Sequence, residues 1–224
     1  MRLEQASAKQ QDLINKHFHL IIEANKTTNL TRIDSVEDGL LLHVEDSLAG
    51  FEFVNAAPSG LYGDLGTGGG FPGIPLAVLT GRPTLLVDSV GKKTKVLDGV
   101  LQQLGLQETV QTYHGRIEDL AVEKKGRFSV LSARALAKTS VLMELASPCL
   151  RQGGLLVCYK ANVSEDELNH ARDLQKKLAM YLVEDKSFLL SDNTTHRRIL
   201  VFKKEGKPKL SLPRKVGMAQ KKPL

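Results

Sequence analysis

The sequence predicts an α/β fold: a mostly parallel, Rossmann-like sheet with a terminal antiparallel strand, preceded by an N-terminal helical extension. Three observations support this prediction. Strand-like and helix-like patterns alternate from residue 61 onward, which is typical of βαβ units. The first of these strands leads through a glycine-rich loop into a helix. The next strand ends in an acid, Asp88, about 20 residues beyond that loop, where nucleotide-binding sheets place one.

The helical extension is predicted over residues 1–56. Within residues 12–23, four apolar side chains share one helical face: Ile14, Phe18, Ile21 and Ile22. A polar loop is expected at 25–31. After it, Asp34 and Ser35 are expected to cap a second helix.

The main domain is predicted over residues 57–203. Its expected strands are 61–65, 84–87, 109–113, 128–132 and 154–159, and its expected helices are 74–79, 92–104, 139–150 and 164–180. Two late segments, 186–190 and 197–203, flank a turn-like Ser-Asp-Asn sequence and predict a terminal antiparallel pair. Residues 204–224 are predicted to be a basic C-terminal tail.

The glycine loop that begins at Asp64 has the sequence Asp-Leu-Gly-Thr-Gly-Gly-Gly-Phe-Pro-Gly-Ile-Pro. Glycine permits positive φ and a close approach to a ligand, and the helix that follows offers free N–H groups. The spacing Gly68-x-Gly70-x-x-Gly73 satisfies the dinucleotide fingerprint. The spacing Asp64-x-Gly66-x-Gly68-x-Gly70 equally satisfies the pattern of S-adenosylmethionine (SAM) methyltransferases. A turn without a ligand is disfavoured, because strand, loop, helix and downstream acid occur in order.

Ligands of such sheets bind beyond the carboxyl ends of the strands. The residues at these positions are 64–71, Asp88, 114–118, Arg134 and Lys160. Arg134 directly follows an apolar strand and is either a ligand contact or half of an interdomain salt bridge. His43 and Asp46 lie three residues apart on one helical face, as a surface pair or as part of a site. Ile117 either packs in the core or lines an adenine slot.

The charge of the chain is concentrated in its tail. Seven basic residues and one acid lie between 204 and 224, which accounts for the whole net charge of +6. A basic tail on a neutral body favours a polyanionic partner, although a merely solvated tail has the same composition. Cys149 and Cys158 are not in metal-ligand spacing, so neither a metal nor a disulfide partner is expected. A polar N-terminus and no long apolar run predict a cytoplasmic protein without a membrane partner.

Several enzyme classes are disfavoured by missing motifs. No tyrosine is followed four residues later by lysine, as a short-chain dehydrogenase requires, and neither a P-loop nor a Gly-x-Ser-x-Gly elbow is present. A methyltransferase needs less, because its cofactor supplies the chemistry. The alternatives are a non-catalytic SAM- or nucleotide-binding RNA module for ribosome assembly and a small NAD-dependent oxidoreductase.

Six motifs together closely resemble the GidB/RsmG family. They are Asn25-Lys-Thr-Thr-Asn-Leu-Thr31, His43-Val-Glu-Asp-Ser47, the loop from Asp64 to Pro75, Asp88-Ser-Val-Gly-Lys-Lys93, Ser132-Ala-Arg-Ala135 and Pro213-Arg-Lys215. This family comprises bacterial SAM-dependent methyltransferases that modify N7 of guanine 527 in 16S ribosomal RNA. The resemblance implies a class I methyltransferase fold, SAM as cofactor and the small ribosomal subunit as partner. We expect the protein to act as a monomer.

The resemblance also implies site residues. The expected cofactor-binding residues are Asp64, Gly66, Gly68, Gly70, Phe71, Asp88, Ile117, Glu118 and Arg134. The expected RNA-binding residues are Lys92, Arg116, Lys160, Arg197, Arg214 and Lys215. This chain has Ala24 where the family often has tryptophan, and Val216 and Ala219 where it often has prolines.

The expected reaction needs no base. Guanine N7 carries a free lone pair, so direct in-line attack on the SAM methyl group suffices, with catalysis from positioning and electrostatics. We expect Arg134 to position the reactants and Asp46 to offset the positive charge of the product. Because N7 faces the narrow major groove of A-form RNA, the target is expected to be unpaired or locally opened.

Overall fold

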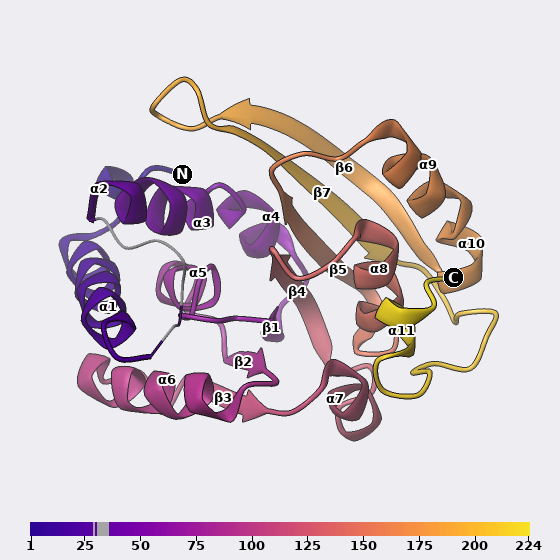
Figure 1. The fold of residues 1–224 in the computed structure, drawn as a ribbon, viewed down its shortest axis with the longest axis horizontal. Coiled ribbons are helices and arrows are strands. Elements are labelled where there is room, and N and C mark those ends of the chain that lie inside the picture. Colours follow the sequence, from indigo (N-terminus) through magenta and orange to yellow (C-terminus); the bar gives the residue numbers. More distant parts are fainter. Residues whose placement is uncertain (29, 31–35) are drawn as a thin grey trace.

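A seven-stranded sheet in the order β3-β2-β1-β4-β5-β7-β6 forms the centre of the computed structural model, which describes residues 1–28, 30 and 36–224 (Figure 1). The strands are β1 (Leu61–Leu65), β2 (Thr84–Asp88), β3 (Val110–His114), β4 (Phe128–Arg134), β5 (Leu150–Lys160), β6 (Met180–Leu189) and β7 (His196–Lys204). The first five are parallel, whereas β7 runs antiparallel to both β5 and β6. This confirms the predicted fold class, including the terminal antiparallel pair.

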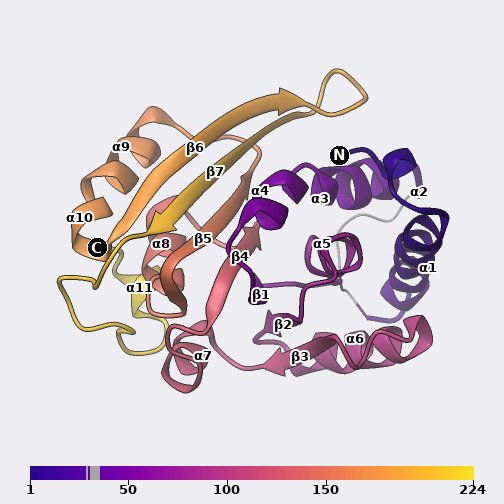
Figure 2. The same ribbon diagram turned by 180° about the vertical axis from the view of Figure 1, so that it is seen from behind.

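Helices cover both faces of the sheet (Figure 2). They are η1 (Leu3–Gln5), α1 (Ala8–Asn25), α2 (Val36–Gly39), η2 (Leu40–Glu45), α3 (Asp46–Leu48), α4 (Phe51–Ala56), α5 (Gly73–Thr80), α6 (Gly91–Leu104), α7 (Ile117–Glu123), α8 (Thr139–Ala146), α9 (Glu165–Asp173), α10 (Gln175–Leu178) and α11 (Met218–Lys221). Successive strand residues point to opposite faces. Leu86 therefore packs with α1, α5 and α6, whereas Leu85 and Val87 pack with α7, α8 and α9.

Several elements differ from the prediction, and two strands begin earlier than expected: β5 at Leu150 instead of 154, and β6 at Met180 instead of 186. The helix expected to run to 150 ends at Ala146, because Pro148 cannot continue it and Leu150 begins β5. The helix expected over 164–180 is divided at Leu174, and Ala179 ends it in the left-handed conformation with φ 54°. The short helix α7 was not predicted, because two turns give too little periodicity to recognise.

The N-terminal extension packs along the sheet edge that carries the glycine loop. Of the four residues predicted on one face, Ile14, Phe18 and Ile21 are fully buried and Ile22 is half-buried, and all four pack in one core with α5 and α6. From Val36 to Ala56 the chain is almost continuously helical and includes one π-helical segment, η2, which carries His43. The expected cap at 34–35 lies outside the described residues, as do positions 29 and 31 of the expected loop.

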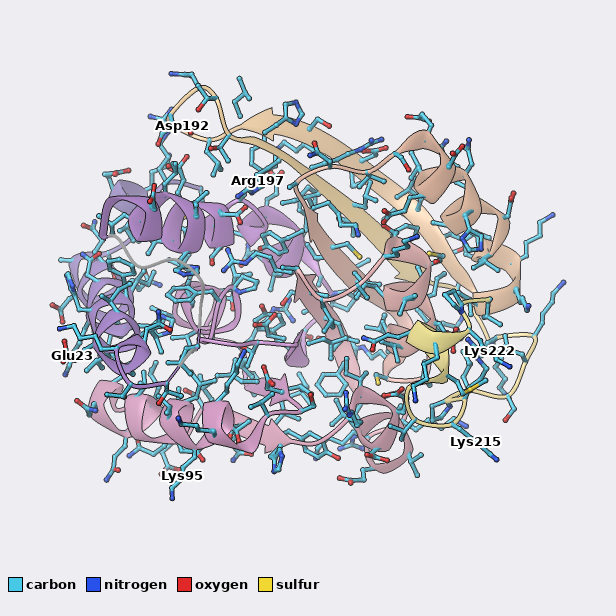
Figure 3. All side chains as sticks on the ribbon, in the orientation of Figure 1. Glu23, Lys95, Asp192, Arg197, Lys215 and Lys222 are labelled. Carbon is cyan, nitrogen blue, oxygen red and sulfur yellow. The ribbon has the colours of Figure 1, made fainter. Side chains whose placement is uncertain are left out.

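The C-terminal tail folds back onto the domain. Leu212 and Ala219 are buried in the core beside α8, and the backbone oxygen of Leu224 lies 2.7 Å from Nε2 of His170. Its exposed charges include Lys215 and Lys222 (Figure 3). The division into three segments at 56 and 204 stays a prediction. In the described part of the chain, no helix combines the length and the apolar character needed to cross a bilayer.

Candidate active site

The glycine loop wraps around the carboxyl end of β2. Gly66, Gly68 and Gly70 have φ values of +70°, +58° and +85°, which only glycine adopts at low cost. The N–H groups of Gly66 and Thr67 both donate to the carbonyl of Val87, at 2.9 and 3.0 Å. A Cβ atom at Gly68 would meet nothing closer than a backbone oxygen at 3.6 Å, so the loop leaves room there for a ligand to approach the backbone.

Asp64, near the end of β1, anchors this loop through hydrogen bonds. Its fully buried carboxylate accepts hydrogen bonds from Thr67 Oγ1 at 2.7 Å, Gly73 N at 3.0 Å and Ser132 Oγ at 2.6 Å. Burial raises the pKa of Asp64 to about 6. Gly73 packs so closely that a Cβ atom would lie 2.4 Å from Leu86. Both residues therefore fix the bend from strand to helix, and neither lines the pocket.

Asp88 lies against the same loop from the end of β2. One of its carboxylate oxygens accepts a hydrogen bond from Gly68 N at 3.0 Å, and the other accepts one from Val90 N at 2.9 Å. The acid and the glycine loop are thus adjacent, as their spacing predicted. Its expected contact with a ribose stays a prediction.

Phe71 connects the loop to the N-terminal extension. Its ring contacts His17 at a centroid distance of 4.3 Å with a tilt of 35°, and it stacks on His43 at 4.7 Å with an interplanar angle of 9°. Nε2 of His17 donates to the carbonyl of Gly69 at 2.9 Å, since a carbonyl only accepts. Burial lowers the pKa of His17 to about 4. Burial, assisted by the charge of Arg134, lowers the pKa of His43 to about 3, so both rings are neutral.

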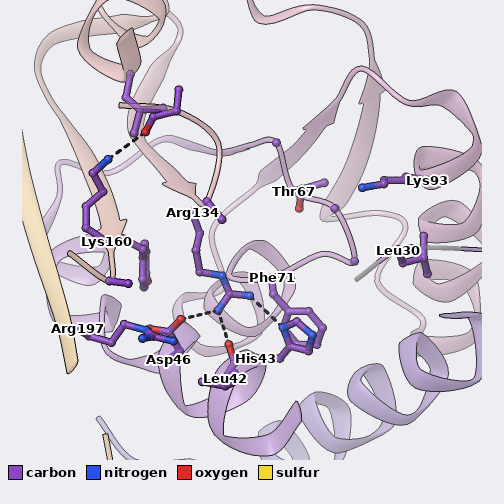
Figure 4. Close-up of a pocket in the computed structure, with 18 of the residues that line it drawn as sticks. Leu30, Leu42, His43, Asp46, Thr67, Phe71, Lys93, Arg134, Lys160 and Arg197 are labelled. Atoms are coloured by element: carbon purple, nitrogen blue, oxygen red, sulfur yellow. Dashed lines mark hydrogen bonds and ion pairs between the residues drawn. The ribbon is translucent and has the colours of Figure 1, made fainter. Parts of the chain in front are cut away.

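Arg134 and Arg197 converge on one carboxylate (Figure 4). Arg134 follows β4 and donates through Nη1 to Asp46 Oδ2 and to the carbonyl of Leu42, both at 3.0 Å. Its Nη2 lies 3.3 Å from Nδ1 of His43. Arg197 donates through Nε to Asp46 Oδ1 at 3.1 Å. Of the two predictions for Arg134, the salt bridge is confirmed, and the same side chain also lines the pocket.

A pocket of about 1240 Å³ lies between the loop, the extension and the ends of β4, β5 and β7. Among the predicted site residues it brings together Asp46, Gly66, Gly68, Phe71, Arg134, Lys160 and Arg197. The pocket lining does not include Asp64, Gly70, Asp88, Ile117, Glu118, Lys92, Arg116, Arg214 or Lys215. The open glycine backbone on one side of the pocket fits a nucleoside cofactor. The cationic side chains of Arg134, Lys160 and Arg197 on the other side fit a substrate that is rich in hydrogen-bond acceptors.

Sequence reasoning missed one cation of this pocket. Lys93, not Lys92, lines the cavity, and its side chain extends toward Thr67 (Figure 4). Adjacent residues on a helix point in different directions, so only one of the two lysines can face inward. Lys92 is exposed, and its Nζ lies 3.4 Å from the carbonyl of Thr27. The two adjacent lysines indicated a cation at this place, but only the orientation of α6 shows which of them faces the pocket.

The other predicted RNA contacts differ in their surroundings. Nζ of Lys160 is 2.8 Å from Glu167 and donates to a backbone carbonyl at 3.0 Å. Arg214 forms a bidentate pair with the buried carboxylate of Glu144, at 2.7 and 2.6 Å. Arg116 and Lys215 are exposed. Of these, only Arg116 and Lys215 present their charge to solvent without an ion pair in the described part of the chain, and all four assignments stay predictions.

Glu118, predicted on the adenine side of the cofactor, contacts the tail instead of lining the pocket. It lies in the first turn of α7, and its Oε1 accepts a hydrogen bond from Gly217 N at 2.7 Å. Ile117 beside it is buried in the main core. This contact joins the C-terminal segment to the helix that follows β3.

Solved structures have the same fold. A cofactor-bound protein from MTB, Rv0187, aligns with a TM-score of 0.58 at 18% identity, over 85% of this chain and 90% of that one. A geranyl diphosphate methyltransferase solved in complex with SAM aligns with a TM-score of 0.53 at 12% identity, over 70% and 84%. A precorrin-6y C5,15-methyltransferase from Geobacter metallireducens GS-15 aligns with a TM-score of 0.55 at 10% identity, over 71% and 87%. The fold of this chain is therefore that of the class I SAM-dependent methyltransferases.

Sequence similarity gives the particular family. The family described as GidB, rRNA small subunit methyltransferase G, matches residues 10–198. Proteins named ribosomal RNA small subunit methyltransferase G from Streptococcus pyogenes serotype M12 (strain MGAS2096) and serotype M49 (strain NZ131) are each 35% identical over 223 residues, or 97% of this chain and 93% of theirs. The chain therefore belongs to the rRNA small subunit methyltransferase G family. This confirms the resemblance, the SAM cofactor and the SAM-dependent rRNA methyltransferase activity expected from the motifs.

Proposed function

We propose that the protein methylates N7 of guanine 527 in 16S ribosomal RNA. In this proposal it acts as a monomer in the cytoplasm, on RNA that belongs to the small ribosomal subunit. The family gives the class of substrate. The choice of atom rests on the chemistry of the pocket.

The observation that carries the proposal is how the acid–base groups of the pocket are engaged. Asp46 accepts from two guanidinium groups. His43 is a neutral ring whose Nδ1 accepts from Arg134, because arginine has only donors. The hydroxyl of Tyr159 donates to the carbonyl of Ser47 at 2.8 Å, and burial raises its pKa well above the usual value. No carboxylate, imidazole or phenol of the described pocket lining is therefore placed to remove a proton from a substrate.

Such a pocket suits an acceptor atom that has a lone pair and no proton. N7 of guanine is one, whereas an exocyclic amino group must lose a proton when it is methylated. The donors of Arg134 and Arg197 also favour guanine over adenine. Guanine presents an acceptor oxygen, O6, beside N7, and adenine presents an amino donor at the same place.

The cofactor is assigned to the loop side of the pocket. Gly66, Gly68 and Phe71 would hold it there, with Asp88 at its ribose. When bound, SAM supplies the activated methyl group. The chain's own contribution is positioning: Asp64 fixes the loop, and Arg134 fixes the opposite wall. The Asp46 carboxylate, expected to offset product charge, is shared by two arginines, so this role has no support from the contacts and stays a prediction.

The test is to map methyl groups on 16S RNA from cells that lack the protein and from cells that re-express it. Re-expression should restore a single 7-methylguanine at position 527, and an Arg134→Ala variant should not restore it. A methyl group at another atom or nucleotide would contradict the proposal. SAM binding in calorimetry without any transfer would favour the non-catalytic RNA module.

A further inference from the structure

We infer that Asp46 is a positioning residue that holds Arg134 and Arg197 together as one clamp for the RNA substrate. This inference rests on the proposed function. Arg134 follows β4, Arg197 lies on β7, and Asp46 begins α3 in the N-terminal extension. The three side chains thus come from parts of the chain that are 88 and 151 residues apart.

Each oxygen of the Asp46 carboxylate serves a different guanidinium group. Oδ2 accepts from Arg134 at 3.0 Å and Oδ1 from Arg197 at 3.1 Å. The Asp46 side chain is 4% exposed, and the arginine side chains are 15% and 18% exposed. Two like charges this poorly solvated repel each other strongly, and the shared carboxylate offsets that repulsion. The cluster keeps one net positive charge at the wall of the pocket.

The two arginines are anchored unequally. Arg134 has further contacts, to the carbonyl of Leu42 and to the ring of His43. Arg197 has only one other hydrogen bond in the described part of the chain, from Nη1 to the carbonyl of His196 at 2.9 Å. A guanidinium carries five N–H donors, so Arg197 retains three for a ligand. Its direction into the pocket depends on Asp46 more than that of Arg134 does.

The remaining donors match the acceptors of RNA. Phosphate oxygens and guanine O6 both accept hydrogen bonds from guanidinium groups. SAM, in contrast, is assigned to the glycine loop on the other side of the cavity. Loss of the Asp46 charge should therefore impair the RNA substrate and the rate of transfer, and it should leave cofactor binding intact.

The first experiment compares Asp46→Asn with Glu45→Gln. Both variants remove one negative charge from adjacent residues, but Glu45 contacts Ser191 of the β6–β7 turn, at 2.7 Å from its backbone N, and forms no ion pair with an arginine among the residues that the structure describes. For Asp46→Asn, kcat/KM toward 16S RNA should fall on the order of 100-fold, since a small misplacement of positioning groups costs that much. Its SAM affinity in calorimetry should equal that of the wild type. Glu45→Gln should retain wild-type kcat/KM.

The second experiment introduces Arg197→Gln into the wild-type protein and into the Asp46→Asn variant. If Asp46 acts by holding Arg197, kcat/KM of the double variant should be little lower than that of the more impaired single variant. Both substitutions then remove the same interaction, so their effects do not add. Additive losses would overturn the inference. So would wild-type kcat/KM in Asp46→Asn, or an equal loss of SAM affinity.

Two controls keep the inference separate from the proposed function. Wild-type protein that transfers no methyl group to 16S RNA would defeat the proposed function, and the clamp would then be tested by the affinity of the same variants for a 16S fragment. If Asp46→Asn fails to fold, as judged by circular dichroism, the inference is tested with the Arg197→Gln variant alone. It should raise KM for RNA without altering SAM affinity, and an unchanged KM would overturn the inference.

Discussion

Nη1 of Arg134 lies 3.0 Å from Oδ2 of Asp46, although 88 residues separate them. This contact makes the N-terminal extension one wall of the active site and not an appendage. A second connection, the ring contacts of Phe71 with His17 and with His43, ties the extension to the glycine loop. The helices before residue 57 therefore help to shape both sides of the pocket.

Replacing Arg134 with alanine should abolish methylation and leave the fold intact, because Asp46 keeps Arg197 as a partner. Tritium transfer from labelled SAM to 16S RNA measures activity, and circular dichroism checks the fold. Arg127→Ala is the matched control, because Arg127 is exposed in the turn before β4. Wild-type turnover of Arg134→Ala would refute the positioning role of this residue.

Replacing Asp88 with alanine should weaken SAM binding by about 10-fold or more, since hydrogen bonds to charged groups contribute roughly 1.5–3 kcal/mol. The variant loses its bonds to Gly68 N and Val90 N as well as the expected ribose contact. Calorimetric titration with SAM gives the affinity. Asp98→Ala, at an exposed position of α6, should bind SAM as the wild type does. Unchanged affinity in Asp88→Ala would mean that the ribose is held elsewhere.

The tail contains two adjacent basic residues with different expected effects. Arg214→Ala leaves the buried carboxylate of Glu144 without its bidentate partner, so the free energy of unfolding should fall on the order of 3 kcal/mol. Lys215→Ala removes only an exposed charge and should lower RNA affinity at unchanged stability. Urea unfolding and RNA titration of both variants separate the effects. Equal stability of the two would contradict a structural role for Arg214.

Deletion of residues 205–224 extends this test. The sequence predicted a greater loss of RNA affinity than of SAM affinity. The contact of Gly217 with Glu118 gives the tail a second connection, to the helix after β3. Equal loss of both affinities on deletion would identify the tail as mainly structural.

His17 should make the protein less stable in acid. Its folded pKa of about 4 lies below the usual value of 6.5, so the unfolded chain binds a proton first as the pH falls. The contribution of His17 is thus fully present above pH 6.5 and is lost toward pH 4, at up to about 1.4 kcal/mol per pH unit. His17→Gln keeps a donor for the carbonyl of Gly69 and removes the titration, so the variant should lose less stability across this window.

Urea unfolding of wild type and variant across the same window measures the difference. Groups whose pKa does not depend on His17, such as Asp64, are present in both proteins and cancel. His19→Gln, on the exposed side of α1, controls for the substitution itself. Parallel pH dependences of wild type and His17→Gln would show that burial of His17 does not control acid stability.

The sequence determined the sheet, the glycine loop and Asp88, because these depend on local patterns: strand periodicity, glycine at positive φ, and an acid one strand further on. It also placed Arg134 at the correct edge, since the carboxyl ends of parallel strands share one edge. Even the choice between dinucleotide and SAM needed no coordinates, because motifs spread over the whole chain identified the family.

Only the tertiary structure decided which charged groups meet. Asp46 pairs with two arginines, Glu144 pairs with Arg214, and Lys93 faces the pocket while Lys92 does not. Nothing in the local sequence encodes these outcomes, because the secondary-structure preference of a charged side chain does not reveal which opposite charge will lie beside it. Their partners are set by how helices and tail pack across the sheet, and in poorly solvated surroundings a charge is tolerated only where that packing supplies an opposite one.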